Sequence, residues 1–208
     1  MIGSAYRFAS QVESGKTAMT LPPQIAPANA HVDWLHGRLE GSFVQERKKT
    51  FSQLRRLFQN AASDGIDPNT VVYRVRWWEP VPPNTEGGLF WGVTEVEAGQ
   101  VGGEYFMTQG HFHAKRDRAE YYGTIEGFGM LILMNKKRET WAEVMSPGSL
   151  HYIPGGIAHR VANTGDMPLS FWACWPSDAG HDYAAIEFEG FGARMMNCDG
   201  SPALVPEN

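Results

Sequence analysis

Residues 120–163 read EYYGTIEGFGMLILMNKKRETWAEVMSPGSLHYIPGGIAHRVAN, and this stretch decides the fold class. Short runs of β-branched and aromatic residues alternate in it with breaks that contain Gly, Pro or Asn. Such runs are typical of strands, because these side chains pack well on a pleated surface. The pattern extends in both directions and predicts strands at residues 71–78, 89–98, 104–113, 120–126, 129–135, 140–145, 150–154, 159–163 and 169–175. Many short strands separated by turn signals favour an all-β sandwich or barrel.

The first seventy residues differ from the strand-rich part. Apolar residues at positions 51, 54, 57 and 58 recur at helical spacing, which predicts a helix near residues 45–60 with the RKK run at 47–49 on its solvated face. Residues 1–30 hold a proline-rich stretch, LPPQIAPANA, that favours extended backbone. We therefore expect an N-terminal extension over residues 1–30 and one folded domain over residues 31–208.

Composition excludes several classes of protein. With 208 residues, 42% hydrophobic and 20% charged, the chain is expected to form a core rather than to stay disordered. The net charge of −5 argues against a generally basic nucleic-acid or anionic-membrane binder. Two cysteines cannot form a disulfide framework, and no targeting or membrane-spanning segment is visible. A cytoplasmic location with no nucleic-acid or membrane partner is the expectation.

Two motifs carry residues suited to metal chemistry. In the first, His111 and His113 are separated by one residue, and Glu120 opens the next predicted strand. Alternate residues of a strand share a face, so the two imidazoles should lie side by side, and an antiparallel partner strand could bring Glu120 opposite them. In the second, the Gly155-Gly156 turn precedes His159, which could supply a third imidazole.

Three imidazoles and a carboxylate suit a divalent transition metal, and ligand positions left open by the protein distinguish a catalytic metal site from a structural one. An H-x-H pair alone is a weak signal, because it occurs on ordinary strands. Surface histidines with a solvated glutamate are the alternative interpretation. Four ligand-type residues at fixed distances from turn glycines are more specific.

The two motifs resemble those of the cupins. Gly148, Pro154, Gly156, His159 and Asn163 fit the second cupin motif, whereas the first motif has six residues between His113 and Glu120 instead of three or four. That longer spacer, within TQGHFHAKRDRAEYY at 108–122, resembles the cupin-type glucose-6-phosphate isomerases of archaea and bacteria, as does PSDAGHDY at 176–183. The resemblance runs from about residue 32 to residue 192.

The resemblance implies a fold, a reaction and a cofactor. The fold is an all-β cupin, a double-stranded β-helix or jelly-roll barrel, with an N-terminal helix and extension. The reaction is the interconversion of glucose 6-phosphate and fructose 6-phosphate in glycolysis and gluconeogenesis, and the assembly is a homodimer. One divalent metal would be bound by His111, His113, Glu120 and His159, with Fe²⁺ expected first. Mn²⁺, Ni²⁺ and Zn²⁺ remain alternatives, because imidazole and carboxylate suit all four ions.

The resemblance also assigns roles in substrate binding and catalysis. The substrate phosphate would be held by hydroxyl groups and backbone donors, namely those of Tyr73, Thr94, Thr108 and Gly110. The same pocket would contain Tyr122, His181 and Tyr183. Glu120 is the first candidate for the proton shuttle and His181 the second, with ring opening as its other possible role. Tyr122 has the strand parity of Glu120 and should face the same interior. Trp175 stands where a relative of this type has Tyr, and an indole cannot accept a hydrogen bond as a phenol can.

Other functions fit parts of the same pattern. One is a different metal-dependent cupin enzyme, such as an Fe(II) dioxygenase, and another is an isomerase acting on a related phosphosugar such as mannose 6-phosphate. A third is a non-catalytic sugar-binding cupin, which would not need an intact ligand set. Within the isomerase reading, transfer of a proton through an enediol and a direct hydride shift both remain open.

Overall fold

The computed structural model describes residues 25–61 and 65–207. Most of the expected extension, residues 1–24, therefore lies outside the described residues, and the division of the chain at residue 30 stays a prediction. The strands are β1 (His31–Asp33), β2 (Arg38–Glu40), β3 (Gln45–Thr50), β4 (Val71–Trp78), β5 (Leu89–Val96), β6 (Gln100–Val101), β7 (Glu104–Tyr105), β8 (Glu120–Glu126), β9 (Gly129–Met134), β10 (Thr140–Met145), β11 (Leu150–Ile153), β12 (Ala158–Asn163), β13 (Leu169–Pro176), β14 (Ala193–Cys198) and β15 (Ser201–Pro206). The helical segments are α1 (Phe51–Leu54), η1 (Arg55–Leu57) and α2 (Ala184–Glu187).

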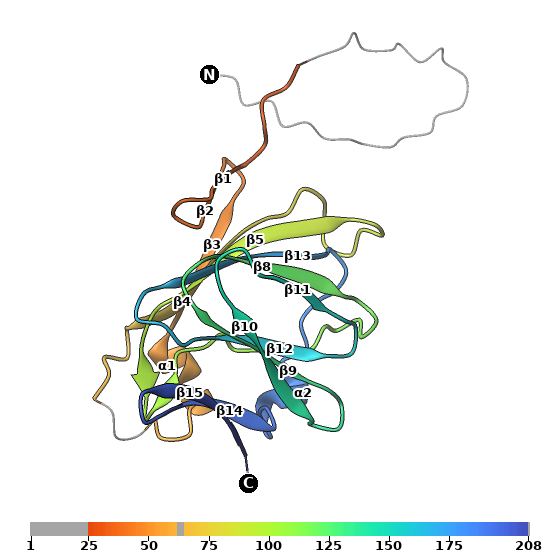
Figure 1. Ribbon diagram of the computed structural model, residues 1–208. Coiled ribbons are helices and arrows are strands. Elements are labelled where there is room, and N and C mark those ends of the chain that lie inside the picture. The colour runs from red at the N-terminus through yellow and green to blue at the C-terminus, as the bar shows by residue number, and fades with distance from the viewer. Residues whose placement is uncertain (1–24, 62–64, 208) are drawn as a thin grey trace, which may run out of the picture.

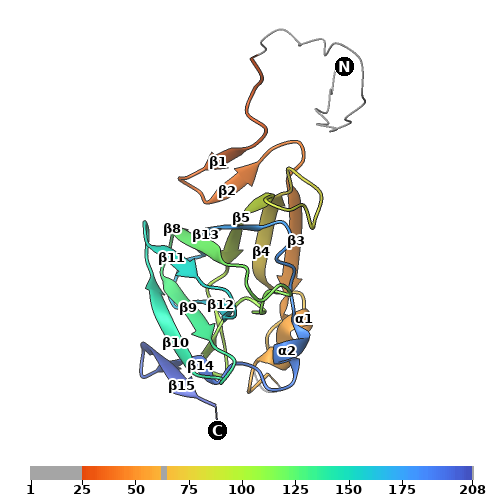
Figure 2. The ribbon, with the colours of Figure 1, turned by 90° about the vertical axis from the view of Figure 1, so that its right-hand side faces the viewer.

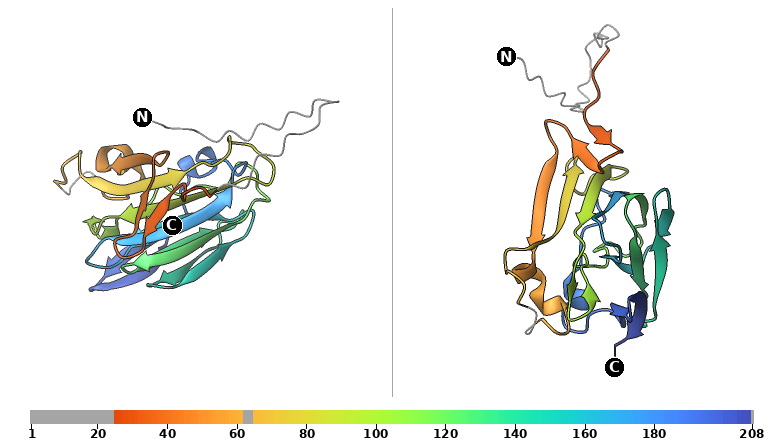
Figure 3. Two further views of the ribbon diagram at one scale, coloured as in Figure 1. Left: turned by 90° about the horizontal axis from the view of Figure 1, so that it is seen from above. Right: turned by 60° about the vertical axis from the view of Figure 1, so that its left-hand side comes forward.

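The strands form an antiparallel barrel, which confirms the predicted all-β fold class. A six-stranded sheet has the order β11-β8-β13-β5-β4-β3, and a three-stranded sheet has the order β10-β9-β12. Figures 2 and 3 show these two sheets facing one another. A small sheet, β15-β14-β7-β6, closes one end together with α1 and α2, and the β1–β2 hairpin lies at the other end (Figure 1).

Most strand predictions match the structure closely, because alternation on a half-buried surface is a local signal. The predicted strands 71–78, 120–126 and 140–145 coincide with β4, β8 and β10 at both ends. The predicted strand at 104–113 is wrong beyond Tyr105: the chain leaves β7 there and makes only isolated bridges, which pair Met107 with Ala162, His111 with His159 and Phe112 with Asp182.

The helix predicted near residues 45–60 is largely wrong. Only Phe51–Leu54 is α-helical, followed by the short 3₁₀ segment Arg55–Leu57. Residues 45–50 form β3, an edge strand that pairs antiparallel with β4. Pairing satisfies the outer backbone groups of β4, and that tertiary gain outweighs the helical spacing of a few apolar residues. The RKK run is thus on an edge strand, where charged side chains discourage further pairing.

One hydrophobic core fills the space between the facing sheets. Its buried members include Val96 and Phe171 from the six-stranded sheet and Leu131 and Val161 from the three-stranded sheet. Inward-facing positions of both sheets therefore define a common interior, and that interior also receives the polar side chains described next. Among the described residues, no helix has the length and apolar character needed to cross a membrane.

Candidate metal centre

The four residues predicted as metal ligands converge inside the barrel. The ligand atoms of His111, His113, Glu120 and His159 all lie within 4.8 Å of one another. Glu120 is the first residue of β8 in the six-stranded sheet, whereas His159 lies on β12 in the three-stranded sheet. His113, Glu120 and His159 are each no more than 5% exposed. The cluster therefore joins the two sheets across the interior.

Backbone bonds place the two histidines of the first motif. His111 exchanges hydrogen bonds with His159, at 3.2 and 3.0 Å, and Phe112 exchanges them with Asp182, at 3.3 and 2.8 Å. The His111 and His113 rings lie 5.7 Å apart between centroids. The expected hairpin partner is wrong, because β8 pairs with β11 and β13 and not with this segment. Glu120 instead reaches the imidazoles from the opposite sheet.

The long spacer between His113 and Glu120 is bound to the downstream loop at 176–183. Lys115 Nζ lies 2.7 Å from Asp178, and Arg118 donates from Nε and Nη2 to the same carboxylate at 2.9 Å each. Arg116 pairs with Asp182 and lies over the Phe112 ring. The basic spacer and the acidic loop thus complement each other in charge, and their contact carries His181 and Tyr183 to the metal-ligand cluster.

Hydrogen bonds to backbone carbonyls fix the orientation of two imidazoles. His113 Nδ1 lies 2.8 Å from the Arg118 carbonyl oxygen, and His159 Nδ1 lies 3.3 Å from that of Ile157. A carbonyl oxygen only accepts, so each Nδ1 carries the hydrogen and each Nε2 presents its lone pair. Those lone pairs face Glu120, whose Oε1 lies 3.3 Å from His113 Nε2 and 2.5 Å from His159 Nε2.

Two buried polar atoms in this cluster lack a hydrogen-bond partner among the described residues. They are Glu120 Oε1 and His159 Nε2. An ionised carboxylate and an unprotonated ring nitrogen are both acceptors, and a buried pair of acceptors is costly unless a cation lies between them. The nitrogen and oxygen donors suit a first-row divalent ion. The residues present therefore fit a bound metal.

The electrostatics of Glu120 and His111 favour the protonation states that metal binding requires. Burial by itself would raise the pKa of Glu120, but the His159 and His113 imidazoles hold it well below its usual value. Burial, reinforced by His159 and His181, holds the pKa of His111 well below 6.5. For His113, burial lowers the pKa but the adjacent Glu120 carboxylate outweighs it and the net shift is upward, so a cation bound here would displace a proton from that ring. An ionised carboxylate and a neutral His111 are ligands ready for a cation.

The residues expected to bind phosphate come from two places. Tyr73 and Thr94 are buried on β4 and β5 and, by strand register, face the barrel interior. Thr108 and Gly110 lie on the segment that runs along β12, so Thr94 and Thr108 are not on adjacent strands. The Thr108 hydroxyl accepts a hydrogen bond from Val161 N–H at 3.0 Å, which leaves its own hydrogen free to be donated. The hydroxyl and amide groups are thus distributed around one interior.

The remaining predicted residues surround His111 and Glu120. Tyr122 is buried beside Glu120, as strand parity predicts, and burial together with Glu120 raises its pKa well above 10. The His181 ring lies 4.3 Å from the His111 ring between centroids and stacks parallel to the Tyr183 ring at 5.6 Å; each residue is exposed on its outer side while its ring packs against the cluster. Trp175 faces inward with the parity of Phe171, and its indole packs edge-on against Phe90.

The sequence interpretation missed two sets of residues. Asp178 and its basic partners Lys115 and Arg118 bind the spacer to the downstream loop. The basic residues of the spacer and the acidic residues of the loop at 176–183 could have indicated this contact from the sequence. The second is Arg160, which follows His159 and is only 5% exposed. An arginine in the predicted strand 159–163, directly before the apolar pair Val161-Ala162, was the signal for it.

An antiparallel barrel that gathers three imidazoles and a carboxylate from facing sheets defines the cupin class of protein. A family model described as Glucose-6-phosphate isomerase (GPI) matches residues 48–205, more than half of the chain. The chain belongs to this glucose-6-phosphate isomerase family, as its motifs predict.

Individual relatives agree with that assignment. A glucose-6-phosphate isomerase of Pyrococcus horikoshii is 38% identical over 184 residues, which cover 86% of this chain and 94% of the relative. One of Thermococcus litoralis is 44% identical over 138 residues, which cover 66% of this chain and 71% of the relative. Among solved structures, oxalate decarboxylase from Bacillus subtilis at pH 4.6 aligns with 52% of this chain and 26% of its own, with a TM-score of 0.41 and 21% identity.

Proposed function

We propose that this chain is a metal-dependent isomerase that interconverts glucose 6-phosphate and fructose 6-phosphate. One observation carries the proposal: Glu120 Oε1 and His159 Nε2 are buried acceptors without a hydrogen-bond partner among the described residues, inside a four-ligand cluster. In a chain of the glucose-6-phosphate isomerase family, a cluster that needs a cation supports metal-assisted chemistry. Such a reaction would place the protein in glycolysis and gluconeogenesis, in the cytoplasm.

The metal would be held by His111, His113, Glu120 and His159, and Fe²⁺ is the ion we propose first. Mn²⁺, Ni²⁺ and Zn²⁺ have the same ligand preferences and stay in the proposal as alternatives. When bound, the ion would supply Lewis acidity, which stabilises the negative charge that develops on the sugar oxygens during isomerisation.

The phosphate would be bound by hydroxyl and amide donors of Tyr73, Thr94, Thr108 and Gly110. Burial raises the pKa of Tyr73, with Tyr183 adding to the shift, so its phenol stays protonated at neutral pH and can donate. A dianionic phosphate accepts several such bonds, and burial excludes competing water. Tyr183, at the exposed side of the cluster, would contact the sugar.

The hydrogen that isomerisation moves between C1 and C2 would be handled by residues beside His111. Glu120 is ionised and so can accept a proton, although a carboxylate that binds a metal is a weakened base and would use its second oxygen. His181 has a pKa lowered by burial and is neutral at pH 7, which suits ring opening by general catalysis. Tyr122 is protonated beside Glu120 and would orient that carboxylate.

Isomerisation in deuterated water separates the two routes. Deuterium at the exchanged carbon of the product supports proton transfer through an enediol. Complete absence of deuterium favours a direct hydride shift, or a shielded base that returns its own proton.

The proposed function is tested by a coupled isomerase assay on metal-stripped protein, followed by re-addition of single metals. We expect negligible activity after stripping and recovery with at least one of the four ions. Activity that survives complete metal removal would contradict metal dependence, and a metal-loaded protein inactive on both sugar phosphates would contradict the isomerase assignment.

We also propose that the protein is a homodimer formed through the outer face of the six-stranded sheet. Strand register aligns a row of outward-facing residues across that sheet, namely Tyr152, Tyr121, Cys174, Trp91 and Trp78. Tyr121 and Tyr152 are 47% and 54% exposed. An aromatic row of this kind supports burial against a second copy.

A further inference from the structure

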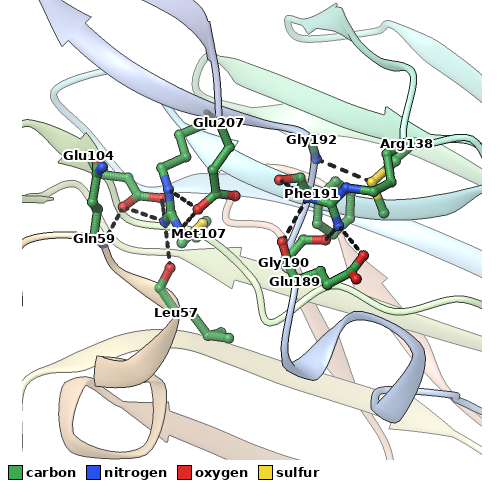
Figure 4. A network of polar contacts seen from close by, with 12 residues as sticks. Leu57, Gln59, Glu104, Met107, Arg138, Glu189, Gly190, Phe191, Gly192 and Glu207 are labelled. Carbon is green, nitrogen blue, oxygen red and sulfur yellow. Dashed lines mark hydrogen bonds and ion pairs between the residues drawn. The ribbon is translucent and has the colours of Figure 1, made fainter.

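Arg160 is a buried cation next to the metal-ligand cluster and has no part in the reaction proposed above. It follows His159 on β12, so its side chain lies on the opposite face of the strand. Its guanidinium lies 4.1 Å from the centroid of the Phe191 ring, and Nη1 lies 3.1 Å from Met107 Sδ. Met107 and Phe191 are both labelled in Figure 4. The side chain is therefore held between the segment that carries Thr108 and the segment before β14.

The chain opposite Arg160 has a local irregularity. Met107 pairs with Ala162 and His111 pairs with His159. The segment from 107 to 111 is therefore one residue longer than the part of β12 that it faces, from 159 to 162. Thr108 bonds Val161 through both its amide and its hydroxyl. Gln109 and Gly110 have no backbone hydrogen bond to β12, and Arg160 Nη2 donates to the Gln109 carbonyl oxygen at 3.1 Å instead. The Arg160 side chain thus holds the Gln109–Gly110 peptide.

The orientation of this peptide follows from its planarity. In a trans peptide the carbonyl oxygen and the next N–H point in opposite directions. Because Arg160 holds the Gln109 oxygen on its own side of β12, the Gly110 N–H points to the other side, which is the side of His159. Gly110 is buried, and no described residue accepts from its amide. A side chain there would meet Arg160 and Phe191 atoms at 3.0 and 2.9 Å, and φ is +76°.

The nearby carboxylates in Figure 4 are paired with a different arginine. Glu104 and Glu207, both labelled there, pair with Arg194, the former at 3.0 Å. The Arg160 side chain lies on the face of β12 opposite to His159 and donates to a backbone carbonyl. This placement argues against Arg160 as a direct ligand of a phosphate on the His159 side and favours an action through the peptide that it binds.

We propose that Arg160 is a positioning residue that turns the Gly110 amide toward the substrate phosphate. The inference rests on the proposed function and deepens it by assigning a residue to phosphate selectivity. Hydrogen bonding of a cation to the carbonyl also polarises the peptide, so the N–H becomes a stronger donor. Loss of the guanidinium frees the peptide to rotate and weakens recognition of the phosphate, while the metal ligands stay in place.

The test compares Arg160→Met and Arg160→Lys with the wild type and with Arg138→Met. Arg138 also donates to backbone carbonyls, those of Glu189, Gly190 and Phe191, and is therefore a matched control that binds the other side of the segment before β14 and does not contact the Gln109–Gly110 peptide (Figure 4). The readouts are metal content, binding of inorganic phosphate by calorimetry, and KM and kcat for fructose 6-phosphate. Binding of glucitol 6-phosphate and of glucitol isolates the contribution of the phosphate.

In Arg160→Met we expect phosphate and glucitol 6-phosphate to bind about tenfold more weakly, with glucitol binding and metal content unchanged. The KM should rise more than kcat falls, Arg160→Lys should recover part of the loss, and Arg138→Met should match the wild type.

Unchanged phosphate binding in folded, metal-loaded Arg160→Met overturns the proposal. If that variant does not fold, the same readouts on Arg160→Lys decide, and wild-type phosphate binding there overturns it. A wild type without isomerase activity overturns the proposed function alone, because phosphate binding does not need turnover.

Discussion

At the scale of single residues, Glu120 combines two roles in the proposed reaction. It offers a ligand atom within 4.8 Å of those of three imidazoles, and those imidazoles keep it ionised. In the proposed reaction the same carboxylate would serve both a cation and a sugar proton. Substitution of Glu120 should therefore affect catalysis more strongly than folding.

Glu120→Gln should lower kcat by at least about 100-fold, because the amide is not a proton acceptor at neutral pH. Metal binding should weaken but stay detectable, since three imidazoles remain. The measurement is the coupled assay together with metal analysis. Glu126→Gln, at the exposed far end of the same strand, is the control and should behave as wild type. Full activity in Glu120→Gln would remove this residue from the mechanism.

Thr108→Val should raise KM by about tenfold with a smaller fall in kcat, because a hydroxyl that only binds phosphate acts equally on the ground and transition states. Steady-state kinetics with fructose 6-phosphate give both constants. Thr108→Ser keeps the hydroxyl and should stay close to wild type. A Thr108→Val enzyme with an unchanged KM would show that the hydroxyl serves Val161 alone, to which it is bonded at 3.0 Å.

At the scale of elements, the contact between the spacer and the downstream loop determines the exposed side of the cluster. Asp178 accepts from Lys115 and Arg118, and Arg118 also presents its carbonyl to His113. One carboxylate thus connects a ligand histidine with the loop that carries His181. The six-residue spacer has a structural reason: it must reach this loop before the chain enters β8.

Asp178→Asn should lower the melting temperature near pH 7, and the difference from wild type should shrink in acid. Hydrogen bonds from Arg118, then from Lys115, lower the pKa of Asp178 below its ordinary value of 3.8. A lowered pKa means that the ionised form stabilises the fold above about pH 4 and that this contribution is lost as pH falls toward the folded pKa. Thermal melts between pH 7 and pH 3 measure it. Asp117→Asn, at a largely exposed carboxylate of the spacer that also pairs with Arg118, is the control. A pH-independent difference would contradict the pairing.

At the scale of the whole molecule, the proposed metal would connect the two sheets. Glu120 comes from the six-stranded sheet and His159 from the three-stranded sheet. A ligand bound only by the folded state stabilises that state by mass action, and a cation here would act across the full width of the barrel. Loss of the metal should therefore lower the melting temperature of the entire fold.

A metal present at about 100 times its Kd stabilises the folded state by about 2.7 kcal/mol. Removal of that metal by a chelator should therefore lower the melting temperature by roughly 5–10 °C for a chain of this size. Differential scanning calorimetry with and without chelator measures the shift. In His159→Ala the shift should largely vanish. His151→Gln is the control: His151 is buried and bonded to Glu143 and Ser149, outside the cluster, so its metal-dependent shift should persist. An identical melting temperature before and after metal removal would contradict a site that joins the sheets.

Tyr121→Glu should convert the proposed homodimer to monomer, because a charge buried within the aromatic row has no partner there. Sedimentation equilibrium gives the assembly mass. Phe188→Glu changes an aromatic residue that is 94% exposed directly after α2, away from that sheet face, and should stay dimeric. A monomeric wild type would show that the outer sheet face has another role.

The sequence by itself determined most strands of the barrel and singled out the four residues that converge in its interior. Alternation in segments such as Val71–Trp78 and Glu120–Glu126 depends only on neighbouring residues, and ligand spacing is read directly from the chain. Family membership followed from the same residues, since the spacer between His113 and Glu120 is a local feature.

Only the tertiary structure decided which segments meet. Residues 45–50 became β3 because β4 offered a partner, although apolar spacing favoured a helix. His111 pairs with β12 and not with β8, and Arg160 holds a peptide four to five residues after β7 ends. Each outcome depends on hydrogen bonds or charges between residues far apart in the chain. Periodicity cannot specify such pairings, because their free energy exists only once the partner segments have been brought together.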